Sequence, residues 1–223
     1  MGFPGFVAMK RSMLTGLQLT LLVAPWALVA TTCACFRFLK RRLSTPWAYF
    51  GGFLFYWLVW CLLLPIGLLG PTALIDLFRP VAPFGEPGWL GAFCLIAPPL
   101  ISLLTIFPRE LRRADRTIVL VSIGLAIVNG TLEEVLWRGT YLVIFRDNLW
   151  LALIYPSLGF AVWHLAPQSI IPFEGQGGKW SLVIAVGFLG LLWAWAANST
   201  GVIVWTVIAH SLIDLSALGW PPQ

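Results

Sequence analysis

The residues best suited to acid–base chemistry form three short motifs in the second half of the chain. They are Glu133-Glu134-x-x-x-Arg138, Phe160-x-x-x-His164 and His210-x-x-x-Asp214. A carboxylate beside an imidazole can activate a water molecule as a general base. A second imidazole, oriented by a carboxyl group, can donate a hydrogen bond to a developing oxyanion. These groups suffice to hydrolyse a peptide bond, whereas no Ser or Cys has an obvious adjacent base for covalent catalysis.

The spacing within the motifs predicts which side chains share a helix face. Side chains four residues apart on a helix are neighbours, so we expect Glu134 to pair with Arg138. Glu133 lies about 100° further round the helix and is free to point elsewhere. By the same spacing, Asp214 is placed to hydrogen-bond His210 and to fix its tautomer.

The motifs lie in a chain that is too apolar for an ordinary soluble protein. Of its 223 residues, 59% are apolar and 10% are charged, with a mean hydropathy of +0.88. A typical soluble domain carries about 25% charged residues. This composition excludes a soluble enzyme, a disordered tail and a nucleic-acid module. The net charge of +5 is attributed to basic loops that set the orientation of the protein in the membrane. We expect an all-α polytopic membrane protein, a single domain over residues 1–223, with the lipid bilayer as its surroundings.

About seven spans are predicted, at roughly 20 residues each. The apolar stretches are 14–36, 47–69, 89–107, 117–145, 149–165, 182–197 and 200–218. Each is interpreted as a helix, because a backbone in lipid must satisfy its own hydrogen bonds. The first is interpreted as a retained span, although Lys10 and Arg11 before it could also open a cleaved signal peptide.

Ionisable residues in the interior of the predicted spans occur in spans four, five and seven. The other four spans contain no Asp, Glu, Lys, Arg or His between their ends. An ionisable residue inside a bilayer costs about 2.5 to more than 10 kcal/mol and therefore marks function. Spans four and five form a hairpin, in which Glu133 and His164 lie about 20–25 Å from the same membrane face, at roughly 1.5 Å per residue. His210, near the middle of span seven, can join them in one buried site.

Basic residues predict the orientation of the bundle. The loops after spans one and three hold eight of them: Arg37, Lys40, Arg41, Arg42, Arg109, Arg112, Arg113 and Arg116. The positive-inside rule makes this side cytoplasmic, which gives a cytoplasmic C-terminus and an external N-terminus. Lys10 and Arg11 argue weakly against the external N-terminus. The compact chain and its basic loops suit a bacterial inner membrane, and the endoplasmic reticulum is the alternative location.

The three motifs, in this order and on separate spans, resemble those of the CPBP family. This family includes CAAX proteases and bacteriocin-processing enzymes, and it is also described as glutamic-type intramembrane proteases or abortive-infection proteins. The matched core covers about residues 117–218. The resemblance implies an intramembrane endopeptidase that cuts near the C-terminus of a membrane-anchored protein or peptide.

The resemblance also implies roles for the matched residues. Glu133 would activate the hydrolytic water with help from His164, and Glu134 and Arg138 would support the site. His210 and Asp214 would stabilise the oxyanion. Many family members have Asn at the last position, so Asp214 would either be protonated or only accept a hydrogen bond from His210.

Two other classes of function stay open. A non-catalytic membrane immunity or interaction protein could use the same scaffold. A proton-coupled transporter also needs buried Glu, His and Asp, but transporters usually contain repeated halves, and the sequence has none. No cofactor is expected, because a His-Glu-x-x-His helix is missing; a zinc site formed by Glu133, His164 and His210 is the alternative.

Overall fold

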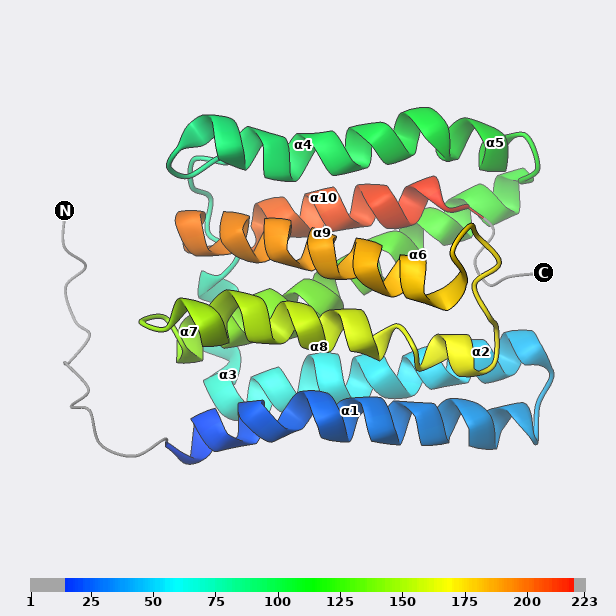
Figure 1. Cartoon of the computed structure of the whole chain (residues 1–223), viewed down its shortest axis with the longest axis horizontal. Helices are drawn as coiled ribbons and strands as arrows, with labels where there is room; N and C mark the ends of the chain where they lie inside the picture. The colour runs from blue at the N-terminus through cyan, green and yellow to red at the C-terminus, as the bar shows by residue number, and fades with distance from the viewer. Residues whose placement is uncertain (1–14, 219–223) are drawn as a thin grey trace.

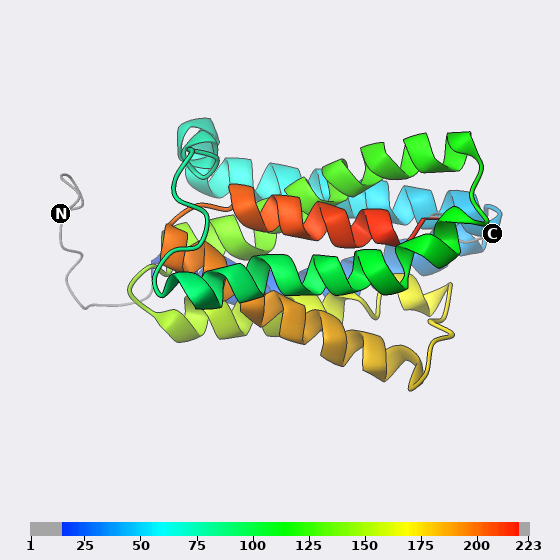
Figure 2. The ribbon, with the colours of Figure 1, turned by 90° about the horizontal axis from the view of Figure 1, so that it is seen from above.

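The computed structural model describes residues 15–218, and throughout that range its regular secondary structure is helical. The helices run back and forth along one common direction, so that successive loops alternate between the two ends of the bundle (Figures 1 and 2). The predicted all-α bundle is therefore confirmed. Lys10 and Arg11 lie outside the described residues, as does the predicted position of the N-terminus.

The first half of the chain flanks the motif-bearing helices on two sides, with residues 16–63 at the bottom of Figure 1 and residues 88–111 at its top. Its helices are α1 (Gly16–Lys40), α2 (Thr45–Phe55), η1 (Tyr56–Leu63), α3 (Leu64–Asp76), α4 (Gly88–Thr105) and α5 (Phe107–Leu111). The segment η1 is a π-helical stretch that joins α2 and α3 into one long helix. This long helix bends near Gly70, whose φ of 74° is one that glycine adopts readily.

The motifs lie on the second half of the chain. Its helices are α6 (Arg116–Glu134), η2 (Val135–Thr140), α7 (Tyr141–Ile144), η3 (Trp150–Ile154), α8 (Tyr155–Trp163), η4 (Pro167–Ser169), α9 (Gly178–Thr200) and α10 (Val204–Ser216). Both η2 and η3 are π-helical, whereas η4 is a short 3₁₀ turn.

Local sequence signals explain where several helices begin and end. Thr15 and Gln18 form a capping box at the start of α1. The Asp115 side chain accepts a hydrogen bond from the Ile118 N–H at 2.8 Å and caps α6. Gly201, with a φ of 74°, ends α9 in the left-handed conformation that suits glycine. The motif-bearing α6 thus begins at a position that the sequence specifies locally.

Within residues 15–218, five helical segments are long and apolar enough to cross a membrane. They are Gly16–Lys40, Thr45–Asp76, Gly88–Leu111, Arg116–Ile144 and Gly178–Thr200, and they correspond to predicted spans one, two, three, four and six. The helices at the other two predicted spans are shorter. The helix at 149–165 covers only residues 150–163 and then turns, and the one at 200–218 is the 13-residue α10. Apolar composition alone does not reveal these turns, and a total of seven spans stays a prediction.

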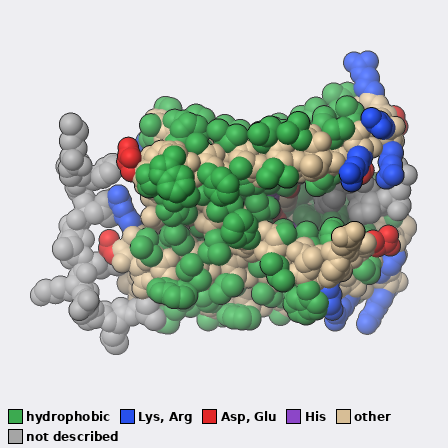
Figure 3. All heavy atoms as spheres, turned by 45° about the horizontal axis from the view of Figure 1, so that its top comes forward, with side chains coloured by type: hydrophobic (Ala, Val, Ile, Leu, Met, Phe, Trp, Pro, Cys, Tyr) green, Lys and Arg blue, Asp and Glu red, His purple; other side chains and the backbone are tan. Residues whose placement is uncertain are grey.

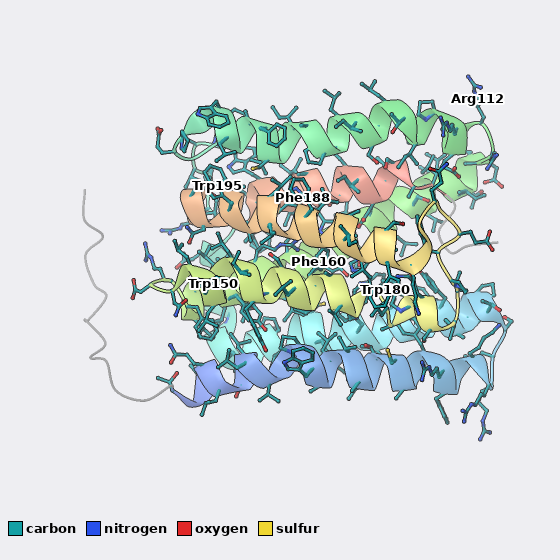
Figure 4. All side chains as sticks on the ribbon, viewed as in Figure 1. Arg112, Trp150, Phe160, Trp180, Phe188 and Trp195 are labelled. Atoms are coloured by element: carbon teal, nitrogen blue, oxygen red, sulfur yellow. The ribbon has the colours of Figure 1, made fainter. Side chains whose placement is uncertain are left out.

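The surface of the bundle is that of an integral membrane protein. Hydrophobic side chains cover the face between the two ends (Figure 3), and exposed examples include Trp89 and Ile184, at 73% and 72% exposure. Soluble monomers rarely expose so continuous an apolar surface. Trp150 and Trp195 lie towards one end and Trp180 towards the other (Figure 4), as expected of tryptophans at the two membrane interfaces.

The two basic loops lie at the same end of the bundle, as predicted. One follows α1 and the other joins α5 to α6, and Figure 3 shows Lys and Arg side chains gathered at this end. The loop between α8 and α9 and the last turn of α10 lie there too. We refer to this part of the molecule as the basic end.

Candidate active site

Small residues let the motif-bearing helices approach closely. Gly130 of α6 faces Ser211 of α10, and a Cβ atom at Gly130 would lie 2.6 Å from the Ser211 Oγ and 3.0 Å from its backbone nitrogen. Gly190 of α9 packs similarly on Ser157 of α8. Such small residues are typical of helix contacts in membranes. The contact between α6 and α10 brings the glutamates of the first motif to His210.

His210 lies between the two adjacent glutamates and is buried with them. Its Nδ1 is 2.9 Å from the Glu134 Oε1, and its Nε2 is 3.4 Å from the Glu133 Oε2. Because a carboxylate oxygen accepts, the Nδ1–H donates to Glu134. Glu134 therefore orients the imidazole and leaves its Nε2 directed towards Glu133.

Arg138 forms the predicted ion pair with Glu134. The Nη1 and Oε1 atoms are 2.8 Å apart, and the two side chains are 1% and 0% exposed. The guanidinium carbon also lies 4.4 Å from the centroid of the Phe160 ring and 5.4 Å from that of Trp193. Phe160 lies where α8 faces α9 (Figure 4). One carboxylate and two aromatic faces thus surround this buried cation.

His164 follows the last residue of α8, where its ring is fixed by the backbone. Its Nδ1 is 2.8 Å from the Phe160 carbonyl oxygen. A carbonyl can only accept, so Nδ1 carries the hydrogen and the Nε2 of the neutral ring is an acceptor. The preceding Trp163 stacks on Tyr56 with ring centroids 3.9 Å apart, and the Gln168 side chain donates to the His164 carbonyl at 2.9 Å.

The prediction of a hydrogen bond between His210 and Asp214 is wrong. The His210 Nε2 and the Asp214 Oδ1 are 3.7 Å apart, which is too long for a hydrogen bond. Other helices supply the partners instead: Glu134 binds the imidazole, and the Asn129 Nδ2 donates to the Asp214 Oδ2 at 2.8 Å. The i,i+4 spacing describes neighbours on one helix but not such competitors across the interface.

One cavity of about 560 Å³ brings together all four residues predicted to be catalytic. Glu133, His164, His210 and Asp214 line it, whereas Glu134 and Arg138 are fully buried and do not. The Glu133 Oε1 is buried and has no hydrogen-bond partner among the described residues. A hollow is visible close to the basic end in Figure 3, where the 167–174 segment contributes to the cavity wall.

Two further polar side chains line the cavity, and the sequence analysis assigns a role to neither of them. Asn129 lines it one helical turn before Glu133, and its Oδ1 accepts a hydrogen bond from the Trp57 Nε1 at 2.8 Å. The i,i+4 spacing from Glu133 could have pointed to Asn129. Nothing in the sequence around Trp57 points to the site, because its helix carries none of the motifs.

The described residues contain no group of three or more His, Cys, Asp and Glu side chains arranged to hold a metal ion. Two imidazole nitrogens are already engaged, the Nδ1 of His164 by a carbonyl and the Nδ1 of His210 by a carboxylate. Both Nε2 atoms would have to serve in a zinc site with Glu133. This alternative stays a prediction for metal analysis.

Comparison with known families connects this geometry to a class of enzymes. Residues 115–216 match the model of the family described as "Type II CAAX prenyl endopeptidase Rce1-like". The match extends over α6 to α10 and contains all three motifs, which confirms the predicted resemblance and indicates a protease. Neither the curated proteins nor the solved structures gave a match to the chain.

Proposed function

We propose that this membrane protein, which is Rce1-like over residues 115–216, is an intramembrane endopeptidase that cuts near the C-terminus of a membrane-anchored protein. The observation that carries the proposal is the single cavity shared by Glu133, His164 and His210. Each of these side chains has the hydrogen-bonding capacity that its role requires. The reaction consumes one water molecule and needs no other reactant.

Water activation is assigned to Glu133 and His164. The buried Glu133 Oε1, which has no partner among the described residues, can accept a hydrogen bond from a water molecule in the cavity. The acceptor Nε2 of His164 can hold the same water from another side. As the water oxygen bonds to the substrate carbonyl carbon, Glu133 takes its proton.

Oxyanion stabilisation is assigned to His210, with Asp214 beside it. The hydrogen bond to Glu134 fixes the ring, and Arg138 holds Glu134 in place, so the Nε2–H of a protonated His210 can donate to the developing oxyanion. When the tetrahedral intermediate collapses, the C–N bond breaks. The proton held by Glu133 then passes to the leaving nitrogen.

The substrate is proposed to be a protein or peptide anchored in the bilayer by its C-terminal region. The family description names prenylated CAAX substrates. Five aromatic side chains of the cavity wall offer an apolar surface to such a segment: Tyr49, Phe53, Trp57, Trp163 and Phe173. We propose that the substrate enters at the basic end, that this end and the C-terminus of the chain are cytoplasmic, and that the membrane is a bacterial inner membrane.

A reconstituted cleavage assay tests the proposal. Purified wild type, Glu133→Gln and Glu86→Gln are inserted into liposomes with a peptide ending in a farnesylated CAAX sequence, and products are identified by mass spectrometry. Glu86 is an exposed carboxylate remote from the cavity, and its variant should cleave like wild type. Glu133→Gln should lose about 10²–10⁴-fold in kcat, the contribution typical of a general base.

A second experiment covers substrates whose C-terminus is not a farnesylated CAAX sequence. The C-termini of membrane proteins are compared between cells that express wild type and cells that express Glu133→Gln. A C-terminus trimmed only in the wild-type cells identifies the substrate. Equal cleavage by the two proteins would refute the role of Glu133, and no difference at any C-terminus together with inactivity in liposomes would favour a non-catalytic interaction protein.

A further inference from the structure

We infer that Asn129 is a positioning residue, which orients the Asp214 carboxyl group through a hydrogen-bond chain that starts at Trp57. The Trp57 Nε1 donates to the Asn129 Oδ1, and the Asn129 Nδ2 donates to the Asp214 Oδ2, each at 2.8 Å. The chain of contacts links η1, α6 and α10 across the wall of the cavity. The inference rests on the proposed function and extends it to a residue outside the three motifs.

The direction of this chain is fixed by its first member. An indole N–H can only donate, so the Asn129 amide must turn its oxygen to Trp57 and its NH₂ group to Asp214. Rotating the amide by 180° would place nitrogen against nitrogen and oxygen against oxygen, and both hydrogen bonds would be lost. The Asp214 Oδ2 is consequently an acceptor.

This direction specifies what the other carboxyl oxygen can do. Because the Oδ2 accepts from Asn129, a proton on Asp214 is favoured on the Oδ1. That oxygen is the one 3.7 Å from the His210 Nε2. Asn129 thus presents a single Asp214 oxygen to the place where the oxyanion would form, and it acts through Asp214 and not on the substrate.

The packing around Trp57 supports a fixed anchor. The indole is 5% exposed, and the Phe53 ring meets it edge-on with centroids 5.6 Å apart. Asn129 lies on the cavity face of α6, in the same stripe as Ala126 and Glu133. A rigid indole in the wall can therefore hold the amide without contacting the reacting groups.

Substitutions that reverse the hydrogen-bond polarity test the inference. Asn129→Asp places two acceptors across the 2.8 Å gap to Asp214, and we expect kcat to fall about 100-fold with KM changed less than threefold. Combining Asn129→Asp with Asp214→Asn restores one donor and one acceptor across the gap. The double variant should have a kcat at least tenfold higher than that of Asn129→Asp. If Asn129→Asp acted only by disturbing the packing, the second substitution would not restore kcat.

Milder variants keep the test valid if Asn129→Asp does not fold. Asn129→Ala and Trp57→Phe should each lower kcat, and the double variant should be no slower than Asn129→Ala, because both act through one chain. Trp60→Phe is the matched control. Trp60 lies on the same π-helical stretch and donates its indole N–H to the Thr31 Oγ1 at 3.1 Å, away from the cavity, so its loss should leave kcat unchanged.

The outcomes separate this inference from the proposed function. An active wild type with an inactive Glu133→Gln variant, together with unchanged kcat for Asn129→Ala and Trp57→Phe, overturns the inference and leaves the function standing. Additive effects of Trp57→Phe and Asn129→Ala also overturn it, because they show two independent contributions. A wild type without peptidase activity overturns the proposed function and this inference together.

Discussion

Arg138→Ala should destabilise the fold far more than the loss of any surface charge. The substitution leaves the carboxylate of Glu134 buried at 0% exposure without its cation. Removing one partner of a buried pair costs about 3–5 kcal/mol. The guanidinium is also lost from the Phe160 ring, 4.4 Å away, a contact worth up to about 2 kcal/mol when desolvated. For a domain of this size, roughly 2–4 °C of Tm per kcal/mol gives a fall of about 6–28 °C.

Thermal unfolding of the purified protein in detergent measures the effect. An exposed ion pair of the same chain, between Arg79 and Asp76, provides the control. Arg79 pairs with Asp76 at 3.9 Å on the surface, where the side chains are 57% and 59% exposed. An exposed pair contributes about 0–1 kcal/mol, so Arg79→Ala should leave the Tm almost unchanged. Both variants remove an arginine side chain from an ion pair with a carboxylate three or four residues earlier in the chain, and the two pairs differ strongly in burial.

A double variant separates the uncompensated charge from the lost volume. Combining Arg138→Ala with Glu134→Gln removes the orphaned charge and keeps a carbonyl oxygen that can accept from His210. We expect it to recover at least half of the lost Tm. If Arg138→Ala unfolds no earlier than Arg79→Ala, the reasoning about the buried pair is refuted. If the double variant is no more stable than Arg138→Ala, packing and not charge causes the loss.

Three further predictions concern catalysis. Like Glu133→Gln, His164→Ala should lose nearly all cleavage, by about 10²–10⁴-fold in kcat. Both proteins should stay inserted and folded, as measured by their recovery from the membrane fraction. Asp214→Asn should keep substantial activity, whereas Asp214→Ala should lose most of it, because side-chain shape and hydrogen bonding matter more here than charge. Elemental analysis of the purified active protein should find no stoichiometric zinc, and chelators should leave cleavage unchanged.

Each of these predictions has a contrary result. Loss of the Glu133→Gln protein from the membrane fraction would count against a purely catalytic role. If Asp214→Asn is as inactive as Asp214→Ala, the negative charge is required, and Asp214 becomes a second base or a metal ligand. Activity that chelation removes and zinc restores would establish a metal site at Glu133, His164 and His210.

Features set by local sequence were predictable, and features set by turns within apolar segments were not. The five long helices follow from apolar runs whose length matches a bilayer. The end of α8 at Trp163 is different, because the chain turns at residues 164–166, before the apolar stretch predicted over 149–165 has ended. The short α10 is likewise set by Gly201 and by the hydrogen bond from the Ile203 N–H to the Leu77 carbonyl at 2.9 Å, a contact between distant parts of the chain.

In the candidate site, contacts within one helix were predictable from the sequence, whereas contacts between helices were not. The pair of Glu134 and Arg138 follows from i,i+4 spacing, and it is present. The partners of His210 and Asp214 depend on which helix lies opposite, and the spacing within α10 carries no information about that. Glu134 and Asn129 reach them from α6 because Gly130 allows close contact with α10.

The balance of charge around His210 is compatible with an aspartate at position 214, where the family that the motifs resemble often has asparagine. Three carboxyl groups, those of Glu133, Glu134 and Asp214, face Arg138 and a His210 that can be protonated. With every group ionised the cluster carries one excess negative charge, and Asn in place of Asp214 would remove it. A proton on the Asp214 Oδ1 would remove it equally and would give that oxygen the donor that an asparagine amide has. Asn129 accommodates either a protonated aspartate or an asparagine at position 214. Its NH₂ group needs only an acceptor oxygen at the place of the Asp214 Oδ2, and an amide oxygen accepts as well as a carboxyl oxygen does.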